Sequence, residues 1–390
     1  MLPAWQYPKG IYSAVLKLLV ISFLVSAFIG LWLLRRPRVE GGQFSDSAAA
    51  EAHKVHRYSV PRLGGVLIFS ALVVATICGF ALGFLDPTLA VPLLLAALPA
   101  FAIGLFEDLR RGIPPWARLT AAFASALLGV ALAGATMTRL DLPWLDTWLL
   151  WTPFAVVATV FAVGGVTQAF NIIDGLNGLA GGIAFLVVGA LVYVAIVLQD
   201  VALAHLGLMI IGGVLGFLIW NYPSGQIFLG DGGAYLLGFL IAEMSLLLVL
   251  RHPEVSAWFP LLLIIYPVWE TVFSIYRRKL VRRRAATSAD RLHLHTLLYK
   301  RLSYGLAYRS AMGRCRQRNS DVSVFAWLLA MAAVAPAILF WGQTLLLQAL
   351  TALFCLYYVW LYRRLVRFRA NRRDPDAIAG KLAQVPTAER

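Results

Sequence analysis

Charged residues are scarce in this chain of 390 residues: they make up 14% of it, whereas hydrophobic residues make up 60%. The mean hydropathy is +0.77. A water-soluble chain of this length needs far more polar surface, so the composition excludes that class and indicates lipid as the main solvent. The length then favours one multi-span bundle over several soluble domains.

Cysteine is also rare, with three residues in the whole chain. Cys78 and Cys355 lie in apolar runs and Cys315 lies in a basic loop. Their positions exclude a disulfide framework and a cysteine-based metal site. The sequence also lacks a P-loop, which argues against an ATP-driven pump, and it lacks a Ser-His-Asp arrangement.

Long apolar runs are abundant, and each is compared with the roughly 20 residues that cross a bilayer. They predict an all-α, polytopic bundle of ten or eleven spans, in which the run at 89–106 is short for a span. The first run is too long for a signal peptide and is followed by Arg35, Arg36 and Arg38, so we expect it to be retained. The predicted spans are 11–34, 64–85, 89–106, 119–138, 148–169, 179–198, 202–220, 232–250, 258–276, 322–341 and 344–362.

Basic residues predict the orientation of the bundle. Segments 35–63, 107–118, 277–321 and 363–390 hold six, three, thirteen and eight Lys or Arg, which is 30 of the 34. Because short cytoplasmic loops are enriched in Lys and Arg, we expect the N-terminus outside and the C-terminus inside. The same bias explains the net charge of +15, so no nucleic-acid partner is expected. We predict one catalytic membrane domain over 1–370 and a disordered basic tail over 371–390.

The inner segments also carry most of the polar motifs. Glu107 and Asp108 directly follow an apolar run. They are interpreted either as an interfacial cap paired to Arg110 or Arg111, or as a site for Mg²⁺ or for a proton of a phosphate substrate. The pair alone does not separate the two interpretations.

The segment at 170–178 is richer in oxygen-bearing side chains. Asn171, Asp174 and Asn177 are three residues apart, and in a continuous helix they would share one face. Irregular polar backbone at membrane depth is tolerated where it is buried in protein or lines a cavity. Hydrogen bonding between helices is one interpretation of these polar residues. A site for a hard cation or a nucleotide fits the spacing and the flanking glycines better.

Two further inner segments complete the set. Asp231 lies between glycines at the start of a long apolar run, as an N-cap or as a functional carboxylate. His293 and His295 are two residues apart, so they point to one side of an extended loop and fit a diphosphate clamp better than a transition-metal site. Together these segments offer oxygen ligands for a hard metal and cationic groups for phosphate. The chemistry they favour is Mg²⁺-assisted phosphoryl transfer from a cytosolic nucleotide to a lipid.

The motifs also resemble those of a known family. The chain is similar over about residues 53–301 to the polyprenyl-phosphate N-acetylhexosamine-1-phosphate transferases (glycosyltransferase family 4), in particular the bacterial undecaprenyl-phosphate GlcNAc-1-phosphate transferases. The motifs that carry the resemblance are Pro61-Arg-Leu-Gly-Gly65, Glu107-Asp108, Asn171-Ile-Ile-Asp-Gly-Leu-Asn-Gly-Leu-Ala180, Asn221 to Asp231, and His293-Leu-His295.

The resemblance implies a role for each motif residue. Asp231 and Asn171 would hold Mg²⁺, for which Mn²⁺ can substitute, against the diphosphate of a UDP-sugar, and Asp174 would support that site. Asn177 and Asn221 would contact the uracil and Phe228 would stack on it.

The remaining motif residues would lie near phosphates or the sugar. Asp108 would lie near the lipid phosphate, and His293, His295 and Arg118 would face the phosphates or the sugar. The catalytic set implied is Asp108, Asp174, Asp231 and His293.

Three departures from the family pattern affect these roles. Glu107 stands where the family usually has an aspartate, which leaves its substrate-binding role open. Thr296 replaces a further histidine. The segment before Pro61 lacks a common Thr-Pro, so His56 and Arg57 are candidates without an assigned role.

The resemblance further implies partners and a location. We expect transfer of an N-acetylhexosamine-1-phosphate from a UDP-N-acetylhexosamine to undecaprenyl phosphate, with release of UMP, at the cytoplasmic face of the bacterial inner membrane. The lipid bilayer is the surrounding partner, and a homodimer is one assembly to expect. The alternatives are the phospho-MurNAc-pentapeptide translocase of peptidoglycan synthesis and, in another class, a secondary transporter of an anionic metabolite.

Overall fold

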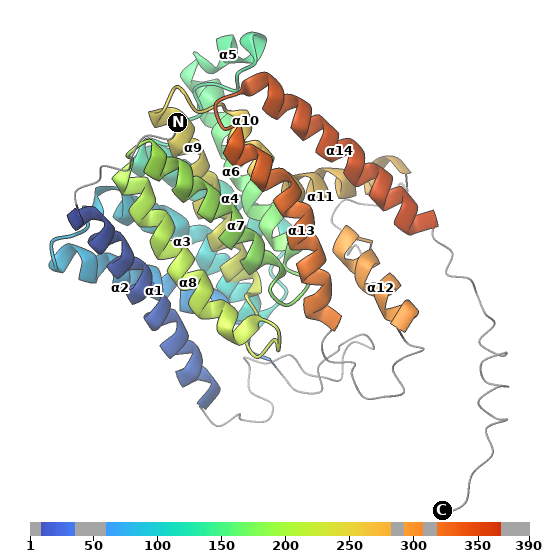
Figure 1. The fold of residues 1–390 in the computed structure, drawn as a ribbon, viewed down its shortest axis with the longest axis horizontal. Helices are drawn as coiled ribbons and strands as arrows, with labels where there is room; N and C mark the ends of the chain where they lie inside the picture. Colours follow the sequence, from blue (N-terminus) through green and yellow to red (C-terminus); the bar gives the residue numbers. More distant parts are fainter. Residues whose placement is uncertain (1–8, 36–59, 282–291, 307–317, 368–390) are drawn as a thin grey trace, which may run out of the picture.

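A computed structural model describes residues 9–35, 60–281, 292–306 and 318–367. The all-α prediction is confirmed, because the described residues form helices and no strand (Figure 1). The tail at 371–390, together with His56 and Arg57, lies outside the described residues. The helices are α1 (Lys9–Arg35), α2 (Gly64–Ala81), α3 (Pro87–Arg110), α4 (Pro115–Ala133), α5 (Pro143–Leu149), α6 (Thr152–Ile173), α7 (Leu179–Val197), α8 (Val201–Asn221), α9 (Gly230–Arg251), α10 (Trp258–Leu263), α11 (Ile265–Tyr276), α12 (Leu294–Leu306), α13 (Arg318–Leu339) and α14 (Thr344–Arg367).

Ten of the described helices are long and apolar enough to cross a membrane. The predicted span at 258–276 is wrong as a continuous helix, because the chain breaks at Ile264 between α10 and α11. Pro267 lacks the N–H that would bond the carbonyl of Leu263, and a proline is best tolerated in the first turn of a new helix. Figure 1 shows α11 lying across the neighbouring spans rather than along them.

One further helix differs from its predicted bounds. The run at 89–106, predicted to be short, is the 24-residue helix α3. It contains Pro92 and Pro99, and the N–H of Ala100 donates to the Ser125 hydroxyl of α4 at 2.9 Å. A neighbouring helix therefore satisfies a backbone group near a proline, as the bilayer interior requires. Glu107 and Asp108 accordingly lie in the last turn of a helix, not in a loop.

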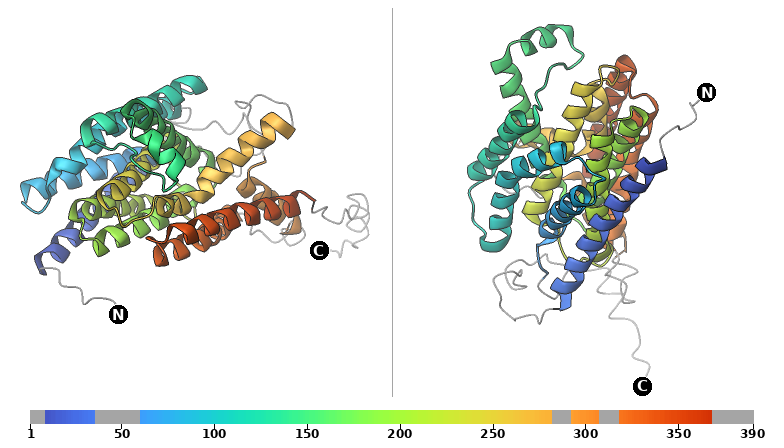
Figure 2. Two further views of the ribbon diagram at one scale, coloured as in Figure 1. Left: turned by 90° about the horizontal axis from the view of Figure 1, so that it is seen from above. Right: turned by 90° about the vertical axis from the view of Figure 1, so that its left-hand side faces the viewer.

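Helix α9 is the centre of the bundle. In its apolar window 89% of the residues are buried, against 22% for α1, α4 and α14. Figure 2 shows the other spans grouped around it. Its first turn packs closely on α3: a Cβ placed on Gly104 would lie 2.6 Å from the Cα of Gly232. This contact brings the ends of α3 and α9, which carry Asp108 and Asp231, together.

A polar network fixes the opposite end of the bundle. Asp141 accepts hydrogen bonds from Arg139 (2.8 Å), the Ser256 hydroxyl (2.9 Å), the Ala257 N–H (2.8 Å) and the Thr344 hydroxyl (3.2 Å). Burial acts to raise the pKa of the Asp141 carboxyl, but these donors outweigh it and hold the pKa below its usual value. The network ties the loops before α5, α10 and α14 to one another.

Candidate active site

Asp231 lies at the centre of a cluster of charges at one end of the bundle. Its Oδ1 is 3.2 Å from Nη2 of Arg62, and its Oδ2 is 3.3 Å from Nη1 of Arg118. The arginine side chains are 32% and 24% exposed, so neither is sealed inside the bundle. Guanidinium groups bind carboxylate and phosphate oxygens alike. The cluster can therefore exchange a carboxylate partner for a phosphate.

Asp108 holds the start of α9. Its Oδ1 accepts from the N–H of Asp231 at 3.0 Å, and its Oδ2 accepts from the N–H of Gly232 at 2.9 Å. It also pairs with Nε of Arg62 at 3.2 Å. The interfacial-cap interpretation therefore names the wrong partners, because Asp108 caps α9 and pairs with Arg62 rather than with Arg110 or Arg111. The same contacts exclude Asp231 as an N-cap, because its carboxylate faces the two arginines.

Asp174 lies near the start of the same helix. It follows the last residue of α6, and its carboxyl is close enough to Gly230, Asp108 and Asp231 for each of them to affect its pKa. Burial raises the pKa of the Asp174 carboxyl to about 7; Asp231 and Asp108 raise it further, while Arg62 opposes them. Asp108 thus accepts from the N–H groups of two successive residues at the start of α9, and Asp174 lies close to the same turn.

Glu107 points away from this cluster. Its Oε2 accepts the N–H of Ile113 at 2.7 Å, across a turn in which Arg111 and Gly112 have positive φ. The adjacent carboxylates are therefore separated, and repulsion between them is avoided. The described contacts give Glu107 a part in shaping the loop between α3 and α4.

The prediction that Asn171, Asp174 and Asn177 share one helical face is wrong. α6 ends at Ile173, and the chain turns before α7 begins, with Gly178 at φ +78°. Asn171 remains in the last turn of α6, half-buried. Asp174 turns towards α9. Asn177 is buried and donates to the carbonyl of Pro223 at 3.3 Å. Only the first two remain candidates for one shared site.

Asn221 holds the same turn in place. Its Oδ1 accepts from the N–H of Gly178, and its Nδ2 donates to the carbonyl of Ile227 at 2.8 Å. Asn221 and Asn177 are both at least 95% buried. In this structure the two amides join the α6–α7 turn to the α8–α9 loop. Their contact with the uracil stays a prediction.

Helix α13 clamps this turn from the other side. Four of its residues, spaced so that they follow one face, contact the turn or the α8–α9 loop. Asn319 accepts from the N–H of Asn177 at 3.1 Å, and the Ser323 hydroxyl donates to the carbonyl of Asn177 at 2.7 Å. The Trp327 indole N–H donates to the carbonyl of Gly178 at 3.1 Å, and Ser320 donates to the carbonyl of Pro223 at 3.0 Å.

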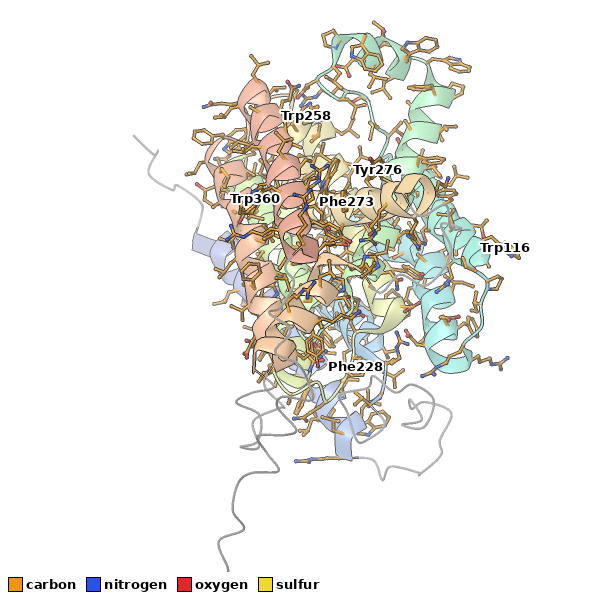
Figure 3. All side chains as sticks on the ribbon, turned by 90° about the vertical axis from the view of Figure 1, so that its right-hand side faces the viewer. Trp116, Phe228, Trp258, Phe273, Tyr276 and Trp360 are labelled. Atoms are coloured by element: carbon orange, nitrogen blue, oxygen red, sulfur yellow. The ribbon has the colours of Figure 1, made fainter. Side chains whose placement is uncertain are left out.

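Phe228 belongs to the loop that leads into α9. Its N–H donates to the carbonyl of Pro61 at 2.9 Å, and its carbonyl accepts from Gly64 at 2.9 Å. The pairing fixes Arg62 next to the start of α9. Figure 3 shows Phe228 at the end of the bundle opposite Trp258, which places this loop at the end that carries the charges.

The two histidines lie side by side at the start of α12. Their rings are parallel within 2°, with centroids 5.5 Å apart. His295 reaches the α6–α7 turn, since a Cβ on Gly175 would lie 2.7 Å from its Nε2. Burial lowers the pKa of the His295 imidazole to about 4; Glu270 opposes this shift and His293 adds to it. His295 therefore lies against the residue that follows Asp174.

Comparison with known proteins identifies the family. Residues 90–249 match the family described as Glycosyl transferase family 4. A probable undecaprenyl-phosphate N-acetylglucosaminyl 1-phosphate transferase of Bacillus subtilis is 26% identical over 298 residues, which cover 75% of this chain and 80% of the relative. A phospho-N-acetylmuramoyl-pentapeptide-transferase of Heliobacterium modesticaldum is 31% identical over 244 residues, which cover 58% of this chain and 73% of the relative. The chain belongs to glycosyl transferase family 4.

A third relative is named for the same activity as the first. It is the undecaprenyl-phosphate alpha-N-acetylglucosaminyl 1-phosphate transferase of Thermotoga maritima, 25% identical over 289 residues, which cover 73% of this chain and 80% of the relative. The matched region 90–249 contains Asp108, Asp174 and Asp231. Membership of the family makes the chain a sugar-phosphate transferase, and the transporter alternative is set aside.

Sequence reasoning missed part of this site. Arg62 was recognised only as a member of a motif, although it bridges Asp108 and Asp231. Glu270 is the other missing residue, although it is the one acidic residue in the apolar run from Ile264 to Ile275. An ionisable residue inside such a run is itself a signal of function.

Proposed function

We propose that this chain transfers an N-acetylhexosamine-1-phosphate, in the first instance GlcNAc-1-phosphate, from a UDP-sugar to undecaprenyl phosphate. UMP is released, and the diphosphate-linked lipid product starts the synthesis of a cell-surface glycan of the O-antigen or capsule type. The site lies on the cytoplasmic side of the bacterial inner membrane. The observation that carries the proposal is the cluster of Asp231, Arg62 and Arg118 at the end of a membrane bundle whose relatives are named for this activity.

The reaction needs little acid–base chemistry from the protein. A phosphate monoester has a second pKa near about 6, so the lipid phosphate is largely a dianion at neutral pH. One of its oxygens bonds to the sugar-linked phosphorus while the bond from that phosphorus to the bridging oxygen breaks. UMP leaves with the bridging oxygen. The work left to the protein is to bring two anions together and to stabilise the charge that develops.

Arg62 and Arg118 are suited to that work. Both are partly exposed, and each now faces an oxygen of Asp231. A phosphate with several oxygens can share these donors with the carboxylate. Asp108 keeps Arg62 in place by pairing with its Nε, leaving the terminal nitrogens for other partners. In this proposal Asp108 is a positioning residue for the arginine and for α9.

The donor set fits Mg²⁺ that completes its shell from the substrate. Asp231, Asp174 and Asn171 supply carboxylate and amide oxygens, whereas no group of three or more His, Cys, Asp or Glu that would hold a metal is found among the described residues. Mg²⁺ is usually bound by one or two carboxylates together with phosphate oxygens and water. Bound there, the ion would neutralise the diphosphate and stabilise the leaving UMP.

The test is UMP release by the purified protein in detergent with UDP-GlcNAc, undecaprenyl phosphate and Mg²⁺. Asp231→Asn removes the charge that orders Arg62 and Arg118, and turnover should fall about 100-fold or more. Asp86→Asn is the matched control: Asp86 caps α3 at the other end of the bundle, and asparagine caps equally well. Near-normal turnover of Asp231→Asn would refute the proposal.

A second donor is favoured by one observation, the 31% identity to the phospho-N-acetylmuramoyl-pentapeptide-transferase of Heliobacterium modesticaldum. The same assay with the UDP-MurNAc-pentapeptide distinguishes the two donors. We expect turnover with UDP-GlcNAc or a related UDP-N-acetylhexosamine to exceed turnover with the pentapeptide donor by at least about tenfold. The opposite order would assign the chain to peptidoglycan synthesis.

A further inference from the structure

Glu270 is a fully buried carboxylate that the chemistry above does not use. It lies in α11 with 0% of its surface exposed. It accepts hydrogen bonds from Nδ1 of His293 at 2.9 Å, from the N–H of Leu294 at 3.2 Å and from the hydroxyl of Tyr358 at 2.7 Å. A buried charge is retained only where donors of this kind compensate it. The arrangement is therefore built around the carboxylate.

These donors come from two other helices. Leu294 is the first residue of α12, and Tyr358 lies in α14. The ring of Phe273 packs against that of Tyr358, with centroids 5.5 Å apart, and Figure 3 shows Phe273 where α11 meets α14. Arg277 adds a second bridge, donating to the carbonyl of Leu292 at 2.6 Å and to the Tyr362 hydroxyl. Glu270 thus joins α11, α12 and α14 at the point where the histidine motif begins.

The contacts of His293 leave one ring nitrogen for a ligand. Its Nδ1 faces Glu270 and also lies 3.2 Å from the Ser274 hydroxyl. Its Nε2 has no hydrogen bond within the part of the chain that the structure describes. The hydrogen bond at one ring nitrogen decides which form the other takes. Because Glu270 accepts from Nδ1, Nε2 is free to accept a proton or, when protonated, to donate to an anion.

The orientation of the His293 ring affects its neighbours in the site. His293 lies parallel to His295, and His295 rests against Gly175 next to Asp174. A rotation of the first ring would therefore disturb the second and the turn that carries Asp174. The chain of neighbours runs from Tyr358 of α14 through Glu270 and the two histidines to Gly175, the residue after Asp174.

We propose that Glu270, supported by Tyr358, is a positioning residue for the sugar-phosphate transfer: it holds Nδ1 of His293 and the first turn of α12 so that Nε2 is presented to the substrate phosphates. The inference rests on the proposed function for the identity of the ligand. Its geometric part, the state of the His293 ring, stands without it. Glu270, His293 and Tyr358 all lie outside the region matched by the family, 90–249.

Glu270→Gln gives the sharpest change. The glutamine is nearly the same shape, but its amide would donate to Nδ1, so that the proton of the neutral ring moves to Nε2. We expect ¹⁵N NMR of histidine-labelled protein in detergent to show His293 protonated at Nδ1 in the native chain and at Nε2 in the variant. His293→Gln assigns the signal. Tyr266→Phe is the matched control, because Tyr266 also lies in α11 and its buried hydroxyl has no hydrogen-bond partner among the described residues.

Kinetics supply the second readout. Glu270→Gln should lower kcat for UMP release about 10- to 100-fold, the range for removing a partner that orients a functional histidine. Its KM for UDP-GlcNAc should change much less than kcat, because Glu270 acts on the substrate only through the orientation of His293. Tyr358→Phe removes one donor and keeps the ring, so it should lower kcat about threefold to tenfold. It is also the variant to rely on if Glu270→Gln does not fold.

The outcomes separate the two proposals. The positioning role of Glu270 is overturned if the His293 signal is unchanged in both Glu270→Gln and Tyr358→Phe. It is also overturned if kcat is unchanged in these variants. A native chain that shows the expected ring state but releases no UMP from any UDP-N-acetylhexosamine overturns the proposed function alone. A fall in kcat of the same size in Tyr266→Phe would reduce the effect to general packing and would also overturn the inference.

Discussion

Asp108 of α3 accepts the backbone N–H of Asp231 of α9 at 3.0 Å, so one carboxylate of the site holds the backbone that carries another. Asp108→Asn would place an amide N–H against the N–H of Gly232 or against Arg62. We expect it to destabilise the protein by about 1–3 kcal/mol, as for an unsatisfied buried donor, and to reduce UMP release with it. Thermal unfolding and turnover are measured together.

The neighbouring carboxylate provides the control. Glu107→Gln keeps an oxygen for the N–H of Ile113, so both losses should be smaller than for Asp108→Asn. Equal losses in the two variants would mean that the capping contact is not what distinguishes Asp108.

The clamp from α13 is tested by one hydroxyl. Ser323→Ala removes the hydrogen bond to the carbonyl of Asn177, and Ser26→Ala removes the same kind of bond, to the carbonyl of Gly213, between α1 and α8. Each should cost about 1 kcal/mol of stability. Only Ser323→Ala should slow UMP release, several-fold, because the α6–α7 turn is loosened. A similar effect on turnover in both variants would contradict a specific role for the clamp.

Glu243 packs against Gly129 in the membrane interior. A Cβ on Gly129 would lie 2.3 Å from Oε1 of Glu243, whose side chain is fully buried. Gly129→Ala should therefore destabilise the protein by about 1–3 kcal/mol through overpacking. Gly165→Ala is the matched control in α6: nothing lies within 4 Å of its added methyl, and we expect no loss of thermal stability. A stable Gly129→Ala variant would show that the end of the Glu243 side chain, or the two helices, can shift to make room.

His295 predicts how stability depends on pH. Its pKa is about 4 in the folded protein and 6.5 in an ordinary environment. Between these values the unfolded chain binds a proton that the folded chain does not, so unfolding is favoured as the pH falls. The contribution is fully present above pH 6.5 and is lost as the pH falls through about 4. Thermal unfolding of the native chain and of His295→Gln should diverge in slope below pH 6.5, and parallel slopes would count against the assignment.

Removal of divalent cations tests the proposed ion. A chelator should abolish UMP release, and excess Mg²⁺ should restore it, with Mn²⁺ as a substitute. Binding of the UDP-sugar should weaken in parallel, because phosphate oxygens complete the shell of the ion. Full activity in the chelator would refute the metal requirement and leave Arg62 and Arg118 as the charges that stabilise the diphosphate.

The sequence predicted the spans well where an apolar run is uninterrupted, because lipid leaves the backbone few alternatives to helix. It failed at Ile264, where the hydropathy is continuous and the break depends on Pro267 and on the packing around it. It also failed at Asn177. Helical spacing placed this residue beside Asp174, but a glycine turn redirects it into the protein. The residues of the site were largely recognisable by type, whereas their partners, such as Arg62 for Asp108 and Tyr358 for Glu270, depend on contacts between distant helices.

The capping of α9 has a consequence for how anions are recognised. The positive end of a helix dipole, with its free N–H groups, is a common place for a phosphate to bind. Here Asp108 already accepts from the N–H groups of Asp231 and Gly232. A diphosphate arriving at this end meets rotatable guanidinium groups instead of rigid backbone amides. Guanidinium groups can turn to follow the two phosphates as the diphosphate is divided between UMP and the lipid product. Their attraction to the phosphates weakens as salt is added.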